Sequence, residues 1–183
     1  MTYANKTQAL TGDYEKSPYY QLLNGTWKFY YTDSYKQLPA DVTEASPSEQ
    51  GWQNITVPGN WEVQGFGTAI YTNHGYEFQP LNPKPPQLPE NTPVGVYRRT
   101  ITVPEDWNGR DIYLHIAGAK SGCYVYLNGK EVGYNEDSKN PAEYRVNDWL
   151  KPGENVLTLK IFRWSTGSYL CLLYTSPSPR DTR

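Results

Sequence analysis

Cysteine, methionine and histidine are scarce in this sequence. Its 183 residues include two cysteines (Cys123 and Cys171), one methionine and two histidines (His74 and His115). Two cysteines cannot build the disulfide framework of a small secreted domain. Two histidines that lie far apart in the sequence do not give the ligand spacing of a zinc site. We therefore expect neither a disulfide scaffold nor a metal site.

Long apolar runs and clusters of basic residues are missing as well. No stretch approaches the roughly 18 apolar residues of a membrane span, and residues 1–24 do not combine a basic start with an apolar segment, so no signal peptide is visible. The formal net charge is -2 with a pI near 5.7. We expect no membrane and no nucleic-acid partner, and the cellular compartment stays open.

Motifs that mark common active sites are also absent. The sequence contains no GxGxxG and no GxxxxGK[ST], the glycine-rich loops that cradle phosphate groups. It contains no G-x-S-x-G, the turn that presents the serine nucleophile of many hydrolases. His115 alternates with the apolar residues of an expected strand, which favours a surface histidine over a catalytic base.

Aromatic residues, glycine and proline are abundant. Aromatics make up 15% of the chain, with 17 tyrosines and 6 tryptophans, and glycine and proline contribute 15 residues each. Tyrosine and tryptophan suit strands, whereas glycine and proline suit turns. Short alternating segments recur at intervals of about 8–12 residues, which predicts an all-β sandwich or jelly roll. The expected strands are 27–31, 55–57, 97–103, 111–116, 124–127, 130–134, 144–146 and 155–162.

Two loops stand out between these strands. Asn128-Gly129 separates two alternating segments and predicts a β-hairpin with a type I′ turn. Residues 74–95 carry six prolines, which remove backbone donors and fix φ, so we expect a stiff extended loop there. A long loop in a compact domain often has a function. The aromatic residues that flank this loop are Trp61, Tyr71, Tyr76 and Phe78. Aromatic rings suit sugar binding, although packing in the core is an alternative explanation for each residue taken alone.

Sugar hydrolysis requires two carboxylates about 5–10 Å apart, and the sequence singles out no such pair. Most acidic residues fall at turns or on strand exteriors, where they are usually solvated. Asp137 follows the hairpin and is better explained as a turn-stabilising residue, although the Glu136–Ser138 segment could line a cleft. The acidic residues that are candidates for such a pair are Glu62, Glu77, Glu131, Glu136, Asp137 and Asp148.

Seven short pieces, in order and with matching spacing, carry a resemblance to a known family. The chain from Trp27 to Trp164 resembles the N-terminal jelly-roll domain of glycoside hydrolase family 2, in particular that of the large bacterial β-galactosidases. The alternatives are a stand-alone carbohydrate-binding module, a truncation that does not fold, or a relative of β-glucuronidase or β-mannosidase type. The matching pieces are Leu23–Phe29, Val57–Trp61, Ile70–Asn73, Gly95–Arg98, Leu127–Tyr134, Glu136–Ser138 and Arg163–Leu170.

The resemblance implies a retaining hydrolase whose two catalytic glutamates lie in a TIM barrel. Such a barrel needs roughly 250 residues, so we expect the chain to lack both glutamates and to be inactive by itself. The implied parent hydrolyses terminal β-galactosides, uses Mg²⁺ and Na⁺, and forms a homo-oligomer. The missing downstream domains would be partners of this chain, and we expect no cofactor in the chain itself.

The resemblance also implies how the domain contributes to the galactose pocket. In the family, an asparagine in a proline-rich loop binds a sugar hydroxyl, and Asn82 occupies that place here. An aspartate in the acidic stretch after Gly-Ser-Tyr-Leu binds sugar and a monovalent cation, but here Cys171 follows Leu170. We expect a lead-in segment at 1–21, an incomplete jelly-roll domain at 22–170 and an unrelated or artefactual tail at 171–183. A jelly-roll domain that stops at Leu170 would expose a sheet edge and apolar surface.

Overall fold

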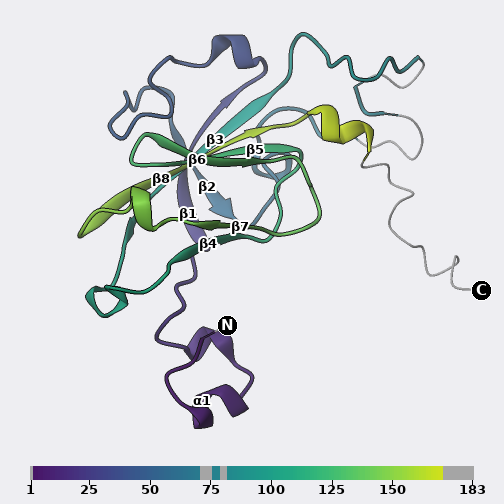
Figure 1. Ribbon diagram of the computed structural model, residues 1–183. Helices are drawn as coiled ribbons and strands as arrows, with labels where there is room; N and C mark the ends of the chain where they lie inside the picture. Colours follow the sequence, from purple (N-terminus) through teal and green to yellow (C-terminus); the bar gives the residue numbers. More distant parts are fainter. Residues whose placement is uncertain (1, 71–75, 79–81, 171–183) are drawn as a thin grey trace, which may run out of the picture.

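A computed structural model describes residues 2–70, 76–78 and 82–170 of the chain. His74, Tyr71 and the predicted tail, which includes Cys171, lie outside the described residues. The body of the molecule consists of antiparallel strands, with one short helix near the N-terminus (Figure 1). None of the helices in the described ranges has the length and apolar character that crossing a bilayer requires.

Eight strands form two sheets, and the predicted all-β sandwich is confirmed. The larger sheet has six strands in the order β2-β1-β3-β8-β5-β6, and the smaller pairs β4 with β7. The strands are β1 (Gly25–Thr32), β2 (Gln53–Val57), β3 (Val94–Thr102), β4 (Tyr113–Ile116), β5 (Gly122–Leu127), β6 (Lys130–Asn135), β7 (Ala142–Arg145) and β8 (Glu154–Phe162).

Helical structure is limited to short segments. The only α-helix that the described residues contain is α1 (Lys6–Leu10). Asn5 caps its N-terminus, because the Asn5 side chain accepts a hydrogen bond from the Gln8 backbone N–H. The 3₁₀ segments are η1 (Tyr14–Lys16), η2 (Tyr35–Gln37), η3 (Glu62–Gln64), η4 (Glu105–Trp107), η5 (Asn147–Trp149) and η6 (Thr166–Tyr169).

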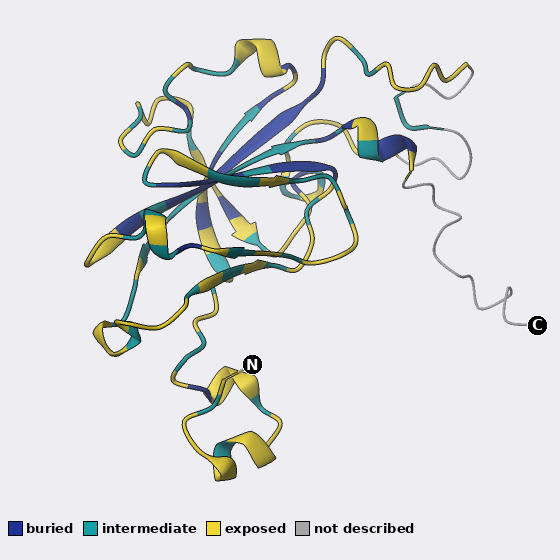
Figure 2. Cartoon of the chain, viewed as in Figure 1, coloured by how far each residue is buried: buried dark blue, intermediate teal, exposed yellow. Residues whose placement is uncertain are grey.

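Alternation of apolar residues correctly predicts the inner faces of the strands. Leu114 and Ile116 of β4 are partly buried, whereas Tyr113 and His115 between and beside them are exposed. Buried residues concentrate on the strands of the larger sheet (Figure 2). The inner core between the two sheets contains Trp27, Phe29, Ile55, Trp61, Tyr97, Cys123, Val125, Leu127, Val146 and Leu157.

The β5–β6 hairpin has the predicted turn. Asn128 and Gly129 both have positive φ, at 54° and 81°, as a type I′ turn requires. The Asn128 side chain adds three hydrogen bonds: its amide donates to Trp149 O at 2.9 Å and to Asn155 Oδ1 at 2.8 Å, and its oxygen accepts from Val156 N at 3.0 Å. The turn is thereby fixed to the neighbouring strand as well as to its own hairpin.

The prediction for the start of β3 was wrong by a few residues. Residues 94–95 were assigned to the proline-rich loop, but β3 begins at Val94. Val94 and Val96 are fully buried in a second, outer core, where they pack with Val42. That residue comes from the long loop between β1 and β2, so a segment distant in sequence supplies the burial that extends the strand.

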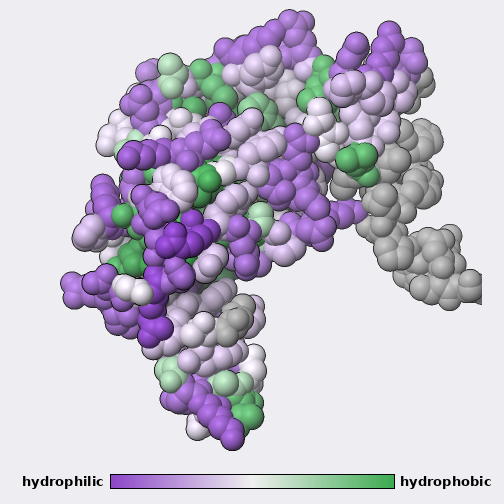
Figure 3. All heavy atoms as spheres, in the orientation of Figure 1, coloured by the Kyte–Doolittle hydropathy of each residue, from purple (hydrophilic) through white to green (hydrophobic). Residues whose placement is uncertain are grey.

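The two sheets leave a large space open between them. The smaller sheet has only two strands, and within the described residues β4 pairs with β7 alone. A space of about 1680 Å³ therefore remains between the sheets, and core side chains such as Leu157 and Leu159 line it. On the face shown in Figure 3, apolar residues form small, separate areas on a mostly hydrophilic surface.

The open space predicts low stability for the 183-residue chain. Apolar walls that remain in contact with water contribute little to folding and attract hydrophobic ligands. We expect the native chain to enhance the fluorescence of 8-anilinonaphthalene-1-sulfonate and to melt below the range of about 45–65 °C that is typical of mesophile domains. A cooperative melt within that range, without dye binding, would show that the inner face is covered.

Candidate functional site

Pairing of β3 with β8 brings two distant segments to one end of the larger sheet. Val94 lies opposite Phe162 in the ladder, and the Arg163 backbone N–H donates to Pro93 O at 2.9 Å. The proline-rich loop that precedes β3 and the turn that follows β8 are therefore neighbours. We call this end of the sandwich, formed by residues 76–78, 82–93 and 163–170, the loop end.

Asn82, the predicted sugar-binding residue, lies at the loop end with its side chain exposed. The loop that carries it is built largely from proline, and Gln87 N donates to Lys84 O at 2.8 Å to close a turn within it. Proline fixes φ, so this short loop has few conformations available. Asn82 is thus presented to solvent on a stiff support.

Tyr169 fastens both sides of the Asn82 loop. Its hydroxyl donates a hydrogen bond to Gln87 O, which lies after Asn82. Its backbone carbonyl accepts from the Tyr76 hydroxyl at 3.3 Å, and its ring contacts those of Tyr76 and Phe78 edge-on at centroid distances of 4.8 and 5.3 Å. One buried side chain therefore fixes the chain before and after Asn82.

Arg163 connects the turn after β8 to two acidic residues. Its side chain is only 9% exposed. The guanidinium donates to Thr68 O at 2.8 Å, lies 3.4 Å from a Glu62 oxygen and lies 3.6 Å from a Glu77 oxygen. A buried guanidinium needs such partners, because an unpaired charge in a protein interior is strongly unfavourable.

Glu77 contacts basic and aromatic groups from two separate segments, one at Lys120 and one at 163–164. Besides Arg163, it pairs with Lys120 and accepts a hydrogen bond from Trp164 Nε1 at 3.4 Å. Burial by itself raises the pKa of Glu77, but its contacts with Lys120 and Arg163 outweigh burial and hold that pKa below its usual value. Glu77 is therefore a carboxylate at neutral pH, and it ties the segment before the Asn82 loop to the end of β8.

The structure brings together two of the acidic candidates, Glu62 and Glu77, at Arg163. Both are engaged by a cation, which is the arrangement of a structural ion-pair cluster. The spacing of Glu62, Glu77 and Arg163 in the sequence does not predict that their side chains lie together. Arg163 was visible only as part of a resembling piece, and no local pattern indicated that it would be buried.

Of the remaining acidic candidates, Asp137, Asp148 and Glu131 have partners close in the sequence, whereas Glu136 also reaches a distant turn. Asp137 accepts hydrogen bonds from the Lys139 and Asn140 backbones, both at 3.2 Å, which confirms the predicted turn-stabilising role. Asp148 is exposed and lies 3.4 Å from Arg145. The other two accept hydrogen bonds: Glu131 from Tyr126, and Glu136 from Tyr134 and the turn at 166–167.

The aromatic candidates divide between core and loop end. Trp61 is 5% exposed and belongs to the inner core, so packing explains it. Tyr76 and Phe78 are partly buried at the loop end, where Phe78 also contacts the Trp164 ring at 5.5 Å. Sequence reasoning missed Trp164 and Tyr169 as parts of this aromatic group, although both lie in the last resembling piece.

His115 is a surface residue, as predicted. Its side chain is 53% exposed, and Nδ1 lies 3.0 Å from a Glu143 oxygen across the β4–β7 pair. Within 2–70, 76–78 and 82–170, no group of three His, Cys, Asp or Glu side chains is arranged to hold a metal ion. These residues therefore offer no such ligand set for Mg²⁺.

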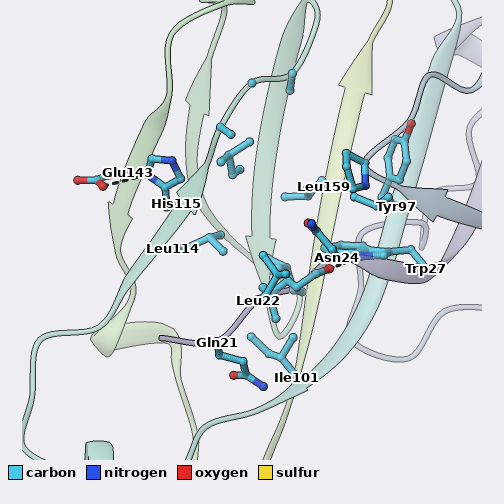
Figure 4. Close-up of a pocket in the computed structure, with 18 of the residues that line it drawn as sticks. Gln21, Leu22, Asn24, Trp27, Tyr97, Ile101, Leu114, His115, Glu143 and Leu159 are labelled. Carbon is cyan, nitrogen blue, oxygen red and sulfur yellow. Dashed lines mark hydrogen bonds and ion pairs between the residues drawn. The ribbon is translucent and has the colours of Figure 1, made fainter. Parts of the chain in front are cut away.

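The space between the sheets extends to the loop end, because Glu77 and Arg163 help to line it, but most of its walls are apolar. In Figure 4, Leu114 on β4 lies across from Leu159, Tyr97 and Trp27 on the larger sheet. These side chains belong to the inner core or pack against it. Sugar sites need several convergent polar groups to match hydroxyls. The core side chains on the two facing sheets do not provide them, whereas Glu77 and Arg163, which also line the space, belong to the loop end. The loop end, with an exposed amide beside an aromatic and charged cluster, is the better candidate.

Comparison with known proteins identifies the kind of domain. A family model described as "Glycosyl hydrolases family 2, sugar binding domain" matches residues 20–172. A protein named β-galactosidase from Priestia megaterium is 36% identical over 172 residues, which cover 93% of this chain and 17% of the relative. A second, from Psychromonas ingrahamii, is 39% identical over 158 residues, which cover 86% of this chain and 15% of the relative. The chain thus spans about a sixth of the length of these relatives.

Solved structures show the same fold. The β-glucuronidase of Bifidobacterium dentium, in complex with coumarin-3-O-glucuronide, aligns with a TM-score of 0.58 at 24% identity. The alignment covers 76% of this chain and 19% of that one. A β-glucuronidase from Ruminococcus gnavus aligns with a TM-score of 0.57 at 20% identity, over 78% of this chain and 21% of that one. At these identities the likeness concerns the sandwich alone.

The Glu77 contacts predict a measurable dependence of stability on pH. The folded-state pKa of Glu77 lies below its unfolded value, so protonation favours the unfolded chain. The contribution of Glu77 is present above about pH 4.3, the usual glutamate pKa, and is lost as pH falls through the folded-state pKa. At pH 7, Glu77→Gln should cost about 1–3 kcal/mol, and its urea midpoint should vary less with pH between about 5 and 3. Glu143→Gln serves as the matched control, and equal losses in both variants would contradict the assignment.

Proposed function

Because the chain belongs to glycosyl hydrolases family 2, as its sugar-binding domain, we propose that it forms one wall of a β-galactosidase sugar cleft. Asn82 is the side chain that binds a galactose hydroxyl in this proposal. The observation that carries it is the placement of Asn82, exposed at the loop end on a segment that Tyr169 fastens on both sides.

The chemistry of an exposed asparagine suits this role. Its amide offers two donors and an acceptor, which can pair with adjacent sugar hydroxyls. Rigid support lowers the entropy lost when a ligand fixes a side chain. Tyr169 and the prolines provide that support, because they restrict the loop before any ligand arrives.

The relatives favour galactose as the sugar. The two curated relatives compared above, 36% and 39% identical to this chain, are named β-galactosidases. The aligned β-glucuronidase structures are at most 24% identical, so they support the fold and not their own substrate. We therefore propose terminal β-galactosides, such as lactose, as substrates of the enzyme to which this domain contributes.

The proposal places bond cleavage outside these 183 residues. Retaining glycoside hydrolysis needs an acid/base carboxylate and a nucleophile about 5–5.5 Å apart. A TIM barrel that could hold them requires roughly 250 residues, more than the 183 present. Downstream domains of the enzyme would supply both glutamates and complete the pocket, together with the Mg²⁺ and Na⁺ of the family. Release of chromophore from a nitrophenyl galactoside by the purified chain would contradict this division.

A galactose titration tests the role of Asn82. With only one wall of the pocket present, we expect a Kd weaker than about 1 mM. Increasing D-galactose, followed by ¹H–¹⁵N NMR of the 183-residue chain, should shift the Asn82 side-chain amide and its neighbours at the loop end. D-glucose should shift them less, because it differs from galactose in the orientation of one hydroxyl.

Two asparagine variants control the titration. Asn82→Ala should reduce the galactose-induced shifts at the loop end at least threefold. Asn108→Ala should leave them unchanged, because exposed Asn108 follows η4, beyond the opposite end of β3. Loop-end shifts that persist in Asn82→Ala, or shifts concentrated in the space between the sheets, would refute the assignment.

A further inference from the structure

We propose that Glu136 is a positioning residue for sugar binding: it fixes the turn at η6 and, through Tyr169, sets the position of Asn82. This inference rests on the proposed role of Asn82. The hydrogen bonds of Glu136 join it to Tyr134 and to the turn, at Thr166 and Gly167, so the proposed effect passes through the turn.

The contacts of Glu136 span two separate parts of the chain. Glu136 follows β6, and one of its carboxylate oxygens accepts from the Tyr134 hydroxyl at 2.5 Å. The other oxygen accepts from the Thr166 hydroxyl at 2.7 Å and from the Gly167 backbone N–H at 2.6 Å. Hydrogen bonds to a carboxylate are stronger than those between neutral groups.

A capping box holds the start of η6, because the Ser168 hydroxyl accepts from the Ser165 backbone N–H at 3.0 Å. Glu136 adds partners for the two residues between them, Thr166 and Gly167. Thr166 is exposed, and the Gly167 amide is one of the N-terminal donors that a helical turn leaves without a partner in its own backbone. Gly167 also allows the close approach, because a Cβ at this position would lie 2.8 Å from the Glu136 carbonyl oxygen. The backbone of Glu136 and the turn are thus fitted against each other.

The last residue of this turn is Tyr169, which fastens the Asn82 loop. The Tyr169 hydroxyl donates to Gln87 O, and its carbonyl accepts from the Tyr76 hydroxyl. A displacement of the turn would therefore move both attachments of the loop together. Glu136, η6, Tyr169 and the Asn82 loop form a continuous path of contacts from the hairpin to the proposed sugar site.

The charge of Glu136 is consistent with this role. Burial by itself raises the pKa of Glu136, but the hydrogen bonds from Tyr134 and Thr166 outweigh it and hold that pKa below its usual value. A carboxylate therefore faces the donors at neutral pH. An amide could partly replace it, since a glutamine oxygen can accept from Gly167 while its NH₂ donates to the Tyr134 hydroxyl.

The test uses ¹H–¹⁵N NMR of the full 183-residue chain without sugar. Glu136→Ala should shift the amides of Asn82, Lys84, Gln87 and Leu88 and lower their heteronuclear NOE values. Glu136→Gln should restore most of the wild-type positions, which a purely space-filling role would not predict. Glu143→Ala removes an exposed acid of β7 that has no contact with η6 among the recorded hydrogen bonds of the described residues, and it should leave the loop unchanged.

Two further variants keep the test decisive if Glu136→Ala does not fold. Thr166→Val removes one exposed donor to Glu136 and should produce smaller loop shifts in the same direction. Tyr169→Phe removes only the hydroxyl, and adding Thr166→Val to it should shift the loop less than the sum of the two single variants, because both act along one path. Retained dispersion of the β3 and β8 amides reports that each variant is folded.

Specific outcomes would overturn the proposal. Glu136→Ala or Thr166→Val could shift the amides of 166 and 167 while the loop from 82 to 88 stays unchanged, which would confine Glu136 to the turn. Equal loop shifts in Glu143→Ala would indicate general loosening. Because these readouts need no ligand, a failure of galactose to bind would count against the proposed function and leave the positioning result intact.

Discussion

The antiparallel ladder between β3 and β8 is the constraint on which the proposed site depends. It pairs nine residues of each strand, from Val94 opposite Phe162 to Thr102 opposite Glu154. The residues before β3 and after β8 must therefore emerge at the same end of the sheet. Asn82 and Tyr169 lie 87 residues apart in the sequence, and this ladder is what makes them neighbours. A slip of one residue would turn every side chain of one strand to the opposite face, and would separate Arg163 from Glu77 as well.

The ion pairs at the loop end favour one geometry more than they favour overall stability. Burying charges costs solvation energy that their attraction offsets only in part. The 9% exposed Arg163 donates a hydrogen bond to one carbonyl and forms ion pairs with two carboxylates, Glu62 and Glu77. An arrangement with those partners missing would leave a buried charge unpaired, so alternative loop positions are disfavoured. Rigid support of this kind suits the role that we propose for the uncharged, exposed side chain of Asn82, which is to select one sugar hydroxyl.

Local pattern was sufficient for the strands and one turn. Alternation placed Leu157, Leu159 and Ile161 on the inner face of β8, and Asn128-Gly129 predicted the hairpin. Local pattern did not predict that β3 begins at Val94, because the neighbouring Pro93 favours a loop. The burial of Val94 comes from Val42, which lies 52 residues earlier in the sequence. Local pattern could not predict the loop end either, because its contacts join residues that are distant in the sequence. Glu77, Lys120 and Arg163 come together only after the sheet has formed. The role of Asn82 came from resemblance, since its composition and neighbours alone do not distinguish it from other exposed asparagines.

The central claim is that the loop end, and not the apolar space between the sheets, is the sugar-facing surface of this domain. Paramagnetic relaxation enhancement with a nitroxide-labelled β-galactoside measures this directly, because line broadening reports which amides lie near the bound label. The account predicts that broadening centres on Asn82 and extends to residues 76–78 and 164–169, and that excess unlabelled galactose removes it. Broadening centred on Leu114, Leu157 and Leu159, or spread evenly over the surface, would contradict it.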